Sequence, residues 1–138
     1  MRYLNGWAPV ALAALRIIAA LLLLEHGLMK FFAFPAAQPG LPSPMPPLMM
    51  LAGTIEIIGG ALLTLGLFTR PAAFVCAGFA AAAYFMGHAG RSFYPALNNG
   101  EAAVFFCFVF FYLTFAGAGA FSLDSLMGRR QGATAYAR

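Results

Sequence analysis

Two histidines and a glutamate lie near one end of the apolar segments of this chain: His26, His88 and Glu101. Histidine exchanges protons near neutral pH and a carboxylate can relay them, so these side chains could perform acid–base chemistry. His26 and His88 each follow, by seventeen residues, the proline that opens their segment, Pro9 or Pro71. Both therefore lie about 25 Å along a helix from that proline. We predict that His26, His88 and Glu101 are the catalytic residues of a polar rim.

The same three side chains are types that also bind metal ions, but no HxxxH or comparable pairing accompanies them. We therefore predict no metal site. A plainer alternative for the rim is that these residues only reach water at the edge of a membrane. Their common depth does not decide between the alternatives, because convergence also depends on how each helix is rotated.

Two charged residues lie deeper inside apolar segments, Arg16 and Glu56. An ionisable group in hydrocarbon costs a few kcal/mol and normally faces the interior of a helix bundle. Glu56 shares its helix face with Gly53, Gly59 and Gly60, and small residues let a neighbouring helix approach closely. Counting along the helices puts Arg16 and Glu56 roughly 8 Å apart in depth. We predict that they form an ion pair. The alternative to a functional pair is a purely structural one that only fixes the register of the helices.

The elements that position these residues are predicted to be membrane helices. Of the 138 residues, 62% are hydrophobic and 9% are charged, whereas about a quarter are charged in a soluble domain. About twenty apolar residues cross the ~30 Å hydrocarbon core. The first segment is too long for a signal peptide, and Arg16 interrupts it. The predicted fold class is an all-α integral membrane four-helix bundle, a single domain over residues 1–138 with spans of about 9–29, 48–68, 71–89 and 101–120.

Orientation is predicted from the distribution of lysine and arginine, which are enriched in cytoplasmic loops. With four spans, both termini and the middle loop lie on one side, so both termini are predicted to be cytoplasmic and the histidine rim outer. The net charge of +4 follows from this bias, and we infer no binding of nucleic acid from it. The predicted cytoplasmic side holds Arg2, Arg70, Arg129, Arg130 and Arg138, and the other side holds Lys30 and Arg91.

Cysteines and aromatic residues are predicted to serve packing. Cys76 and Cys107 lie on different spans, roughly 13 Å apart in depth, which is beyond the reach of a disulfide. Phe105, Phe108 and Phe115 follow a helical stripe on the last span, where a flat ring could stack. Aromatic residues surround that helix, however, and this favours packing or lipid contact.

Several motifs taken together resemble the DoxX family. They are LRIIAALLLLEHGLMKFF, GTIEIIGGALLTLGLFTRPAA, NNGEAAVFF and GAGAFSLD, and the resemblance extends from about Leu15 to Asp124. The long proline-rich first loop departs from the family pattern, as does Ala118, where a proline is expected. The matching positions are Arg16, His26, Gly27, Lys30, Glu56, Gly59, Gly60, Arg70, His88, Glu101, Ser122, Leu123 and Asp124.

The resemblance implies a multi-pass protein of a bacterial or archaeal inner membrane that works in a quinone-linked redox system. Its partners would be the lipid bilayer and either a protein subunit or a second copy of the chain. Two alternatives stay open, a non-catalytic anchor or assembly partner of a redox complex and a small-solute or proton-coupled transporter, so whether the chain is itself an enzyme is open too. With His26, His88 and Glu101 as the catalytic residues, the quinone-binding residues would be Arg16, Lys30, Glu56 and Tyr84.

Overall fold

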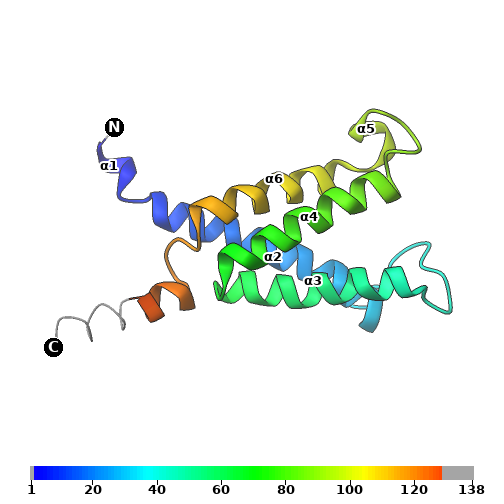
Figure 1. Cartoon of the computed structure of the whole chain (residues 1–138), viewed down its shortest axis with the longest axis horizontal. Coiled ribbons are helices and arrows are strands. Elements are labelled where there is room, and N and C mark those ends of the chain that lie inside the picture. The colour runs from blue at the N-terminus through cyan, green and yellow to red at the C-terminus, as the bar shows by residue number, and fades with distance from the viewer. Residues whose placement is uncertain (1, 129–138) are drawn as a thin grey trace.

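The structure, a computed structural model, describes residues 2–128. Within this range it contains helices and no strand, in agreement with the predicted all-α class. Figure 1 shows the long helices running beside one another. The long helices are α2 (Ala8–Phe32), α3 (Pro47–Leu65), α4 (Thr69–Gly87) and α6 (Glu101–Ala116), and the short ones are α1 (Arg2–Asn5) and α5 (Pro95–Asn98).

Prolines and glycines set the helix boundaries. The proline-rich loop ends where α3 begins at Pro47, and α3 ends at Leu65 because Gly66 adopts a left-handed φ of 65°. At the end of α6, Gly117 has a φ of 82°. The last long helix therefore stops at Ala116, before the predicted end near residue 120.

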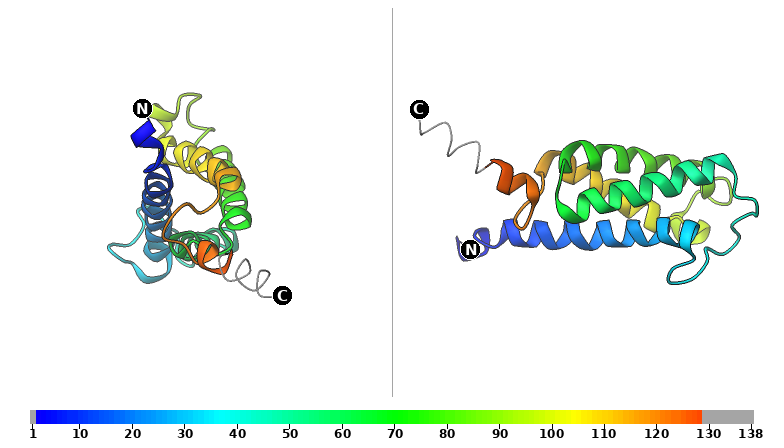
Figure 2. Two further views of the ribbon diagram at one scale, coloured as in Figure 1. Left: turned by 90° about the vertical axis from the view of Figure 1, so that its left-hand side faces the viewer. Right: turned by 90° about the horizontal axis from the view of Figure 1, so that it is seen from below.

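The long helices pack as two close pairs. α2 lies along α3, and α4 lies along α6, with fewer contacts between the pairs. Seen end-on in Figure 2, α2, α3, α4 and α6 surround a common axis, and we refer to them as the bundle. Glycines allow the first pair to approach closely, because a Cβ atom on Gly60 would lie 2.8 Å from the Cβ of Leu24.

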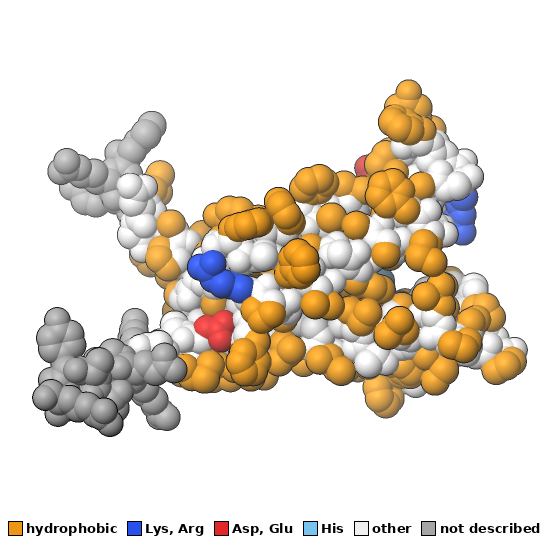
Figure 3. Space-filling view, in the orientation of Figure 1, with side chains coloured by type: hydrophobic (Ala, Val, Ile, Leu, Met, Phe, Trp, Pro, Cys, Tyr) orange, Lys and Arg blue, Asp and Glu red, His pale blue; other side chains and the backbone are white. Residues whose placement is uncertain are grey.

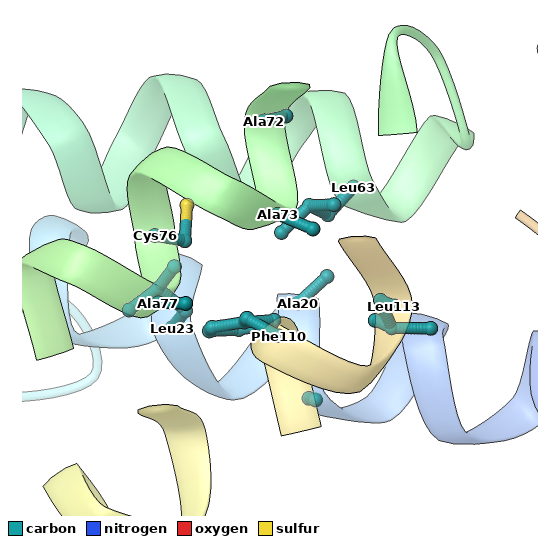
Figure 4. Packing of buried hydrophobic residues seen from close by; sticks show 10 residues of the cluster. Ala20, Leu23, Leu63, Ala72, Ala73, Cys76, Ala77, Phe110 and Leu113 are labelled. Carbon is teal, nitrogen blue, oxygen red and sulfur yellow. The ribbon is translucent and has the colours of Figure 1, made fainter. Parts of the chain in front are cut away.

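The centre of the bundle is made largely of alanine and a few larger side chains, as Figure 4 shows. Phe110 and Leu113 from α6 meet Leu63 from α3 and a row of small residues from α4. Small side chains let the helices pack at short distances. The buried cluster consists of Ala19, Ala20, Leu23, Leu63, Ala72, Ala73, Cys76, Ala77, Phe110 and Leu113.

The sides of the bundle are apolar, and hydrophobic side chains cover most of the face shown in Figure 3. Two helices, α2 and α3, are long and apolar enough to cross a membrane, and α6 is a shorter apolar helix. Phe105, Phe108 and Phe115 are all more than 60% exposed, as side chains in contact with lipid would be. Four crossings remain a prediction.

Two ends of the bundle are distinguished below. The loop end carries residues 33–46 and 88–100, and the terminal end carries α1 and residues 117–128, which we call the closing segment. Both described ends of the chain therefore lie at the terminal end (Figure 1). This arrangement suits an even number of crossings, and which side faces the cytoplasm stays a prediction.

Candidate functional site

A buried ion pair joins α2 to α3 near the loop end. Lys30 Nζ donates hydrogen bonds to both carboxylate oxygens of Glu56, at 2.8 and 2.7 Å. The two side chains are only 5% and 7% exposed. Gly53 makes room for this contact, since a Cβ atom there would lie 3.2 Å from Lys30 Cδ and 2.7 Å from the Phe31 ring. The glycine predicted to form a packing seam thus also accommodates the lysine.

The predicted ion pair between Arg16 and Glu56 is wrong. Lys30 lies in the last turn of α2, opposite Glu56 in the antiparallel α2–α3 pair, and therefore reaches the carboxylate first. Arg16 lies towards the terminal end of α2, where its guanidinium finds different acceptors. Counting residues from the span ends had suggested the pairing, but the observed register of α2 against α3 places Arg16 several turns away from Glu56.

All of the Arg16 hydrogen bonds go to backbone carbonyl oxygens. Nη1 donates to Leu63 and Thr64, at the end of α3. Nε and Nη2 donate to carbonyls of the closing segment, at Ala118, Ala120 and Phe121. These five bonds match the five N–H donors of a guanidinium, and the side chain is fully buried. Arg16 therefore ties α2 to α3 and to the closing segment, and keeps no donor for a ligand.

Asp124 of the closing segment caps α4. Its carboxylate oxygens accept hydrogen bonds from the backbone N–H groups of Phe68 and Thr69, both at 2.9 Å. Its own N–H donates to the Gly66 carbonyl. Partial burial opposes ionisation, but the hydrogen bonds from Thr69 and Phe68 and the charge of Arg16 outweigh it and hold the pKa of Asp124 below its ordinary value.

The lowered pKa of Asp124 predicts a pH dependence of stability. A carboxyl group with a depressed pKa in the folded state stabilises the protein above its unfolded pKa, and this contribution is lost as the pH falls through the folded pKa. Asp124→Ala removes both acceptor oxygens and should therefore lower the free energy of unfolding by about 0.5–2 kcal/mol at neutral pH, the usual worth of a helix cap. This loss of stability should become smaller at acidic pH, because the wild-type carboxylate is then protonated and contributes less. Unfolding in detergent at neutral and acidic pH measures it, and an equal cost at both would contradict this assignment.

His26 lies on the exposed side of α2, four residues before Lys30. Its Nδ1 is 2.8 Å from the carbonyl oxygen of Leu22 and therefore carries the proton of the neutral ring, which leaves Nε2 as an acceptor. The ring meets Phe106 of α6 edge-on, with 5.8 Å between centroids. Lys30 Nζ is 3.5 Å from the His26 carbonyl oxygen. His26 is thus next to the buried ion pair and between α2 and α6.

His88 belongs to a different cluster, at the end of α4. Its Nδ1 is 3.0 Å from the carbonyl oxygen of Asn98, and its ring stacks on Tyr84. The Asn98 side chain donates to the Tyr84 hydroxyl and to the Ser92 carbonyl. Its Oδ1 accepts from the Gly100 N–H. Tyr84, predicted to bind the cofactor, and His88 together order the loop that leads to α6.

Glu101 opens α6 as an exposed side chain in the first helical turn. A negative charge is favourable there because it faces the positive end of the helix dipole. Within residues 2–128 no three His, Cys, Asp or Glu side chains are grouped so that they could hold a metal ion. Cys76 on α4 and Cys107 on α6 are both free.

The contributions of Lys30 and the closing segment were not foreseen from the sequence. Lys30 was predicted to bind the quinone, and its pairing with Glu56 was missed because counting from the span ends placed Arg16 nearer to that carboxylate. The acceptors of Arg16 are backbone carbonyls, which no side-chain pattern reveals. Asp124 was predicted only as a position that matches the family, and no role was assigned to it. The helix that it caps begins more than fifty residues earlier in the chain, so no local pattern reveals the contact.

The fold and the site define a helical membrane protein whose buried charges are bound within the protein. Residues 11–89 match the DoxX family model. The chain is also 43% identical over 129 residues to an uncharacterised protein of Haemophilus influenzae, which covers 91% of this chain and 96% of that protein. It belongs to the DoxX family. No solved structure matches it. The family match includes Arg16, Lys30 and Glu56 and ends before Glu101.

Proposed function

We propose that this protein is a multi-pass subunit of a quinone-linked redox system in a bacterial inner membrane, with both termini cytoplasmic. A quinone head group would bind beside His26 and the ion pair of Lys30 with Glu56. The observation that carries this proposal is the buried ion pair of Lys30 with Glu56. On α2, Lys30 follows the exposed imidazole of His26 by four residues. Buried ionisable groups within a membrane mark ligand sites or proton routes.

The three side chains suit proton exchange. In the neutral His26 ring Nε2 is an acceptor and can take a proton from a hydroxyl group, and the protonated ring can give one back. Lys30 and Glu56 form an ion pair with two short hydrogen bonds, so a proton added to Glu56 or lost from Lys30 changes the net charge of the pair. A bound quinone would supply electron transfer coupled to protons, and the chain would supply the groups that hold and move those protons.

Aromatic residues beside His26 fit a flat ring. Phe106 and Phe110 of α6 stack with ring planes 6° apart and centroids 5.7 Å apart, and His26 points its ring edge-on at Phe106. His26 is exposed and Phe106 is partly exposed, so a flat ring could approach this pair from the membrane. Electrons would come from a partner subunit. His88 and Glu101 would act at the rim, between this site and water.

The test is quinone binding in nanodiscs. His26→Ala should weaken the binding of a quinol by about tenfold, the cost of one good hydrogen bond in a desolvated site. His88→Ala is the matched control, because it removes the same side chain from a cluster that lies on other helices. It should alter binding less than His26→Ala does.

Equal quinol binding by the wild type and His26→Ala would contradict the placement of the head group. If extraction of the gently purified protein yields no quinone and none binds on addition, the quinone role itself is wrong. The chain would then be an anchor or assembly partner, unless proteoliposomes take up a small solute.

A further inference from the structure

A polar cavity lies at the terminal end of the bundle, far from the ion pair. It has a volume of about 450 Å³ and lies between the start of α4 and the closing segment. Arg70 reaches across it, since a Cβ atom on Gly117 would lie 3.5 Å from Arg70 Nε. The lining residues include Thr69, Arg70, Gly117, Ser122, Asp124 and Ser125. Figure 3 shows basic and acidic side chains close together on this part of the surface.

The cavity presents opposite charges that do not neutralise each other directly. Arg70 is exposed and forms no salt bridge with Asp124. Thr69 is 1% exposed, and its hydroxyl lies beside the Asp124 carboxylate without hydrogen-bond geometry to any described residue. Rotation of that side chain would satisfy the hydroxyl with an acceptor brought into the cavity. A ligand with an anionic and a cationic group would match both charges.

The cavity continues into an apolar groove. A second hollow of about 350 Å³ runs between α3 and α4, and Phe68 and Pro71 line both spaces. From Thr54 to Leu62 the groove follows about 12 Å of α3. This is most of the depth of one leaflet, which is about 15 Å, half of the ~30 Å hydrocarbon core. Phe68 is 61% exposed at the junction, where interfacial aromatic residues usually lie.

We propose that these two spaces together bind one phosphatidylethanolamine molecule from the leaflet at the terminal end. The phosphate lies at Arg70, the ammonium group at Asp124, and one acyl chain in the groove between α3 and α4. A polar head cavity beside an apolar groove that follows most of one leaflet's depth matches the shape and charge of this lipid. The proposal shares the multi-pass placement with the proposed function and is independent of quinone binding.

The test uses native mass spectrometry of the full chain. Protein is extracted from vesicles of equal parts phosphatidylethanolamine and phosphatidylglycerol, and the retained lipid is identified. The wild type should retain one phosphatidylethanolamine. Arg70→Gln should reduce the retained fraction by about tenfold, through loss of a charge-assisted hydrogen bond. Val75→Trp, which fills the groove at an exposed position, should reduce it similarly.

Each variant has a matched control. Arg91→Gln removes an exposed arginine at the loop end, and Ile18→Trp adds a tryptophan at an exposed position of α2 outside the groove. Both controls should retain lipid as the wild type does. Retention by Arg70→Gln and Val75→Trp equal to that of their controls would overturn the site. Retention of phosphatidylglycerol equal to or above that of phosphatidylethanolamine would overturn the choice of lipid. Quinol binding should be unchanged in all four variants.

Discussion

Arg16→Met should leave little folded protein. The substitution removes all five hydrogen bonds that the guanidinium donates to carbonyls of α3 and the closing segment. The bonds are buried or partly buried, and a carbonyl that stays away from water without a donor costs about 1–3 kcal/mol. The sum is comparable to the total stability of a small protein, about 5–15 kcal/mol. The measurement is the monodisperse fraction of a fluorescent fusion on size-exclusion chromatography in mild detergent.

Two further variants define the origin of the effect. Arg16→Lys keeps the charge but has three donors on one atom, so it cannot span acceptors on two elements and should recover only part of the folded fraction. Arg91→Met removes an exposed arginine and should behave as the wild type. A wild-type chromatogram for Arg16→Met would show that the carbonyls are satisfied without the arginine.

Removing either member of the buried ion pair should destabilise the protein strongly. Lys30→Met or Glu56→Met alone leaves one charge buried without its partner, which costs about 3–5 kcal/mol. The double variant leaves two apolar side chains between α2 and α3 and should lose much less than the sum of the single losses. The free energy of unfolding in mixed micelles, measured for all four proteins, gives the coupling energy.

A second cycle with Arg91→Met and Glu56→Met supplies the control, because Arg91 is exposed in the loop beyond α4. The losses in free energy of unfolding of these two single variants should add up to the loss of their double variant within about 0.5 kcal/mol. Additive losses for Lys30 and Glu56 as well would mean that the 2.7 Å contact contributes no coupling.

The helices could be predicted because their signals are local. Long apolar runs predicted spans of about 9–29, 48–68, 71–89 and 101–120, and each long helix begins and ends within about four residues of these bounds. The importance of Arg16 and Glu56 was also predictable, since charges are costly in an apolar bundle and must be satisfied. Both are indeed buried.

The partners of these charges were not predictable in the same way. Counting residues from the span ends placed Glu56 closer in depth to Arg16, but Arg16 and Lys30 share one face of α2 and the register of α2 against α3 brings Lys30 level with Glu56. The acceptors of Arg16 arise from backbone geometry, where Gly117 and Gly119 adopt positive φ and turn the chain back under the bundle. At Gly119 a Cβ atom would lie 2.8 Å from the Pro9 carbonyl oxygen, so the turn depends on a contact more than a hundred residues away.

The bonding of Arg16 also has a consequence for biosynthesis. Three of its acceptors, at Ala118, Ala120 and Phe121, follow it by more than a hundred residues. At about 5–20 residues per second, a ribosome reaches them roughly 5–20 s after it has made Arg16. During that interval the first membrane helix carries a guanidinium that water, lipid phosphate or the insertion machinery must solvate. The helix synthesised first is thus among the last to reach its final environment, and a chain truncated before Ala118 would leave that guanidinium without three of its five acceptors.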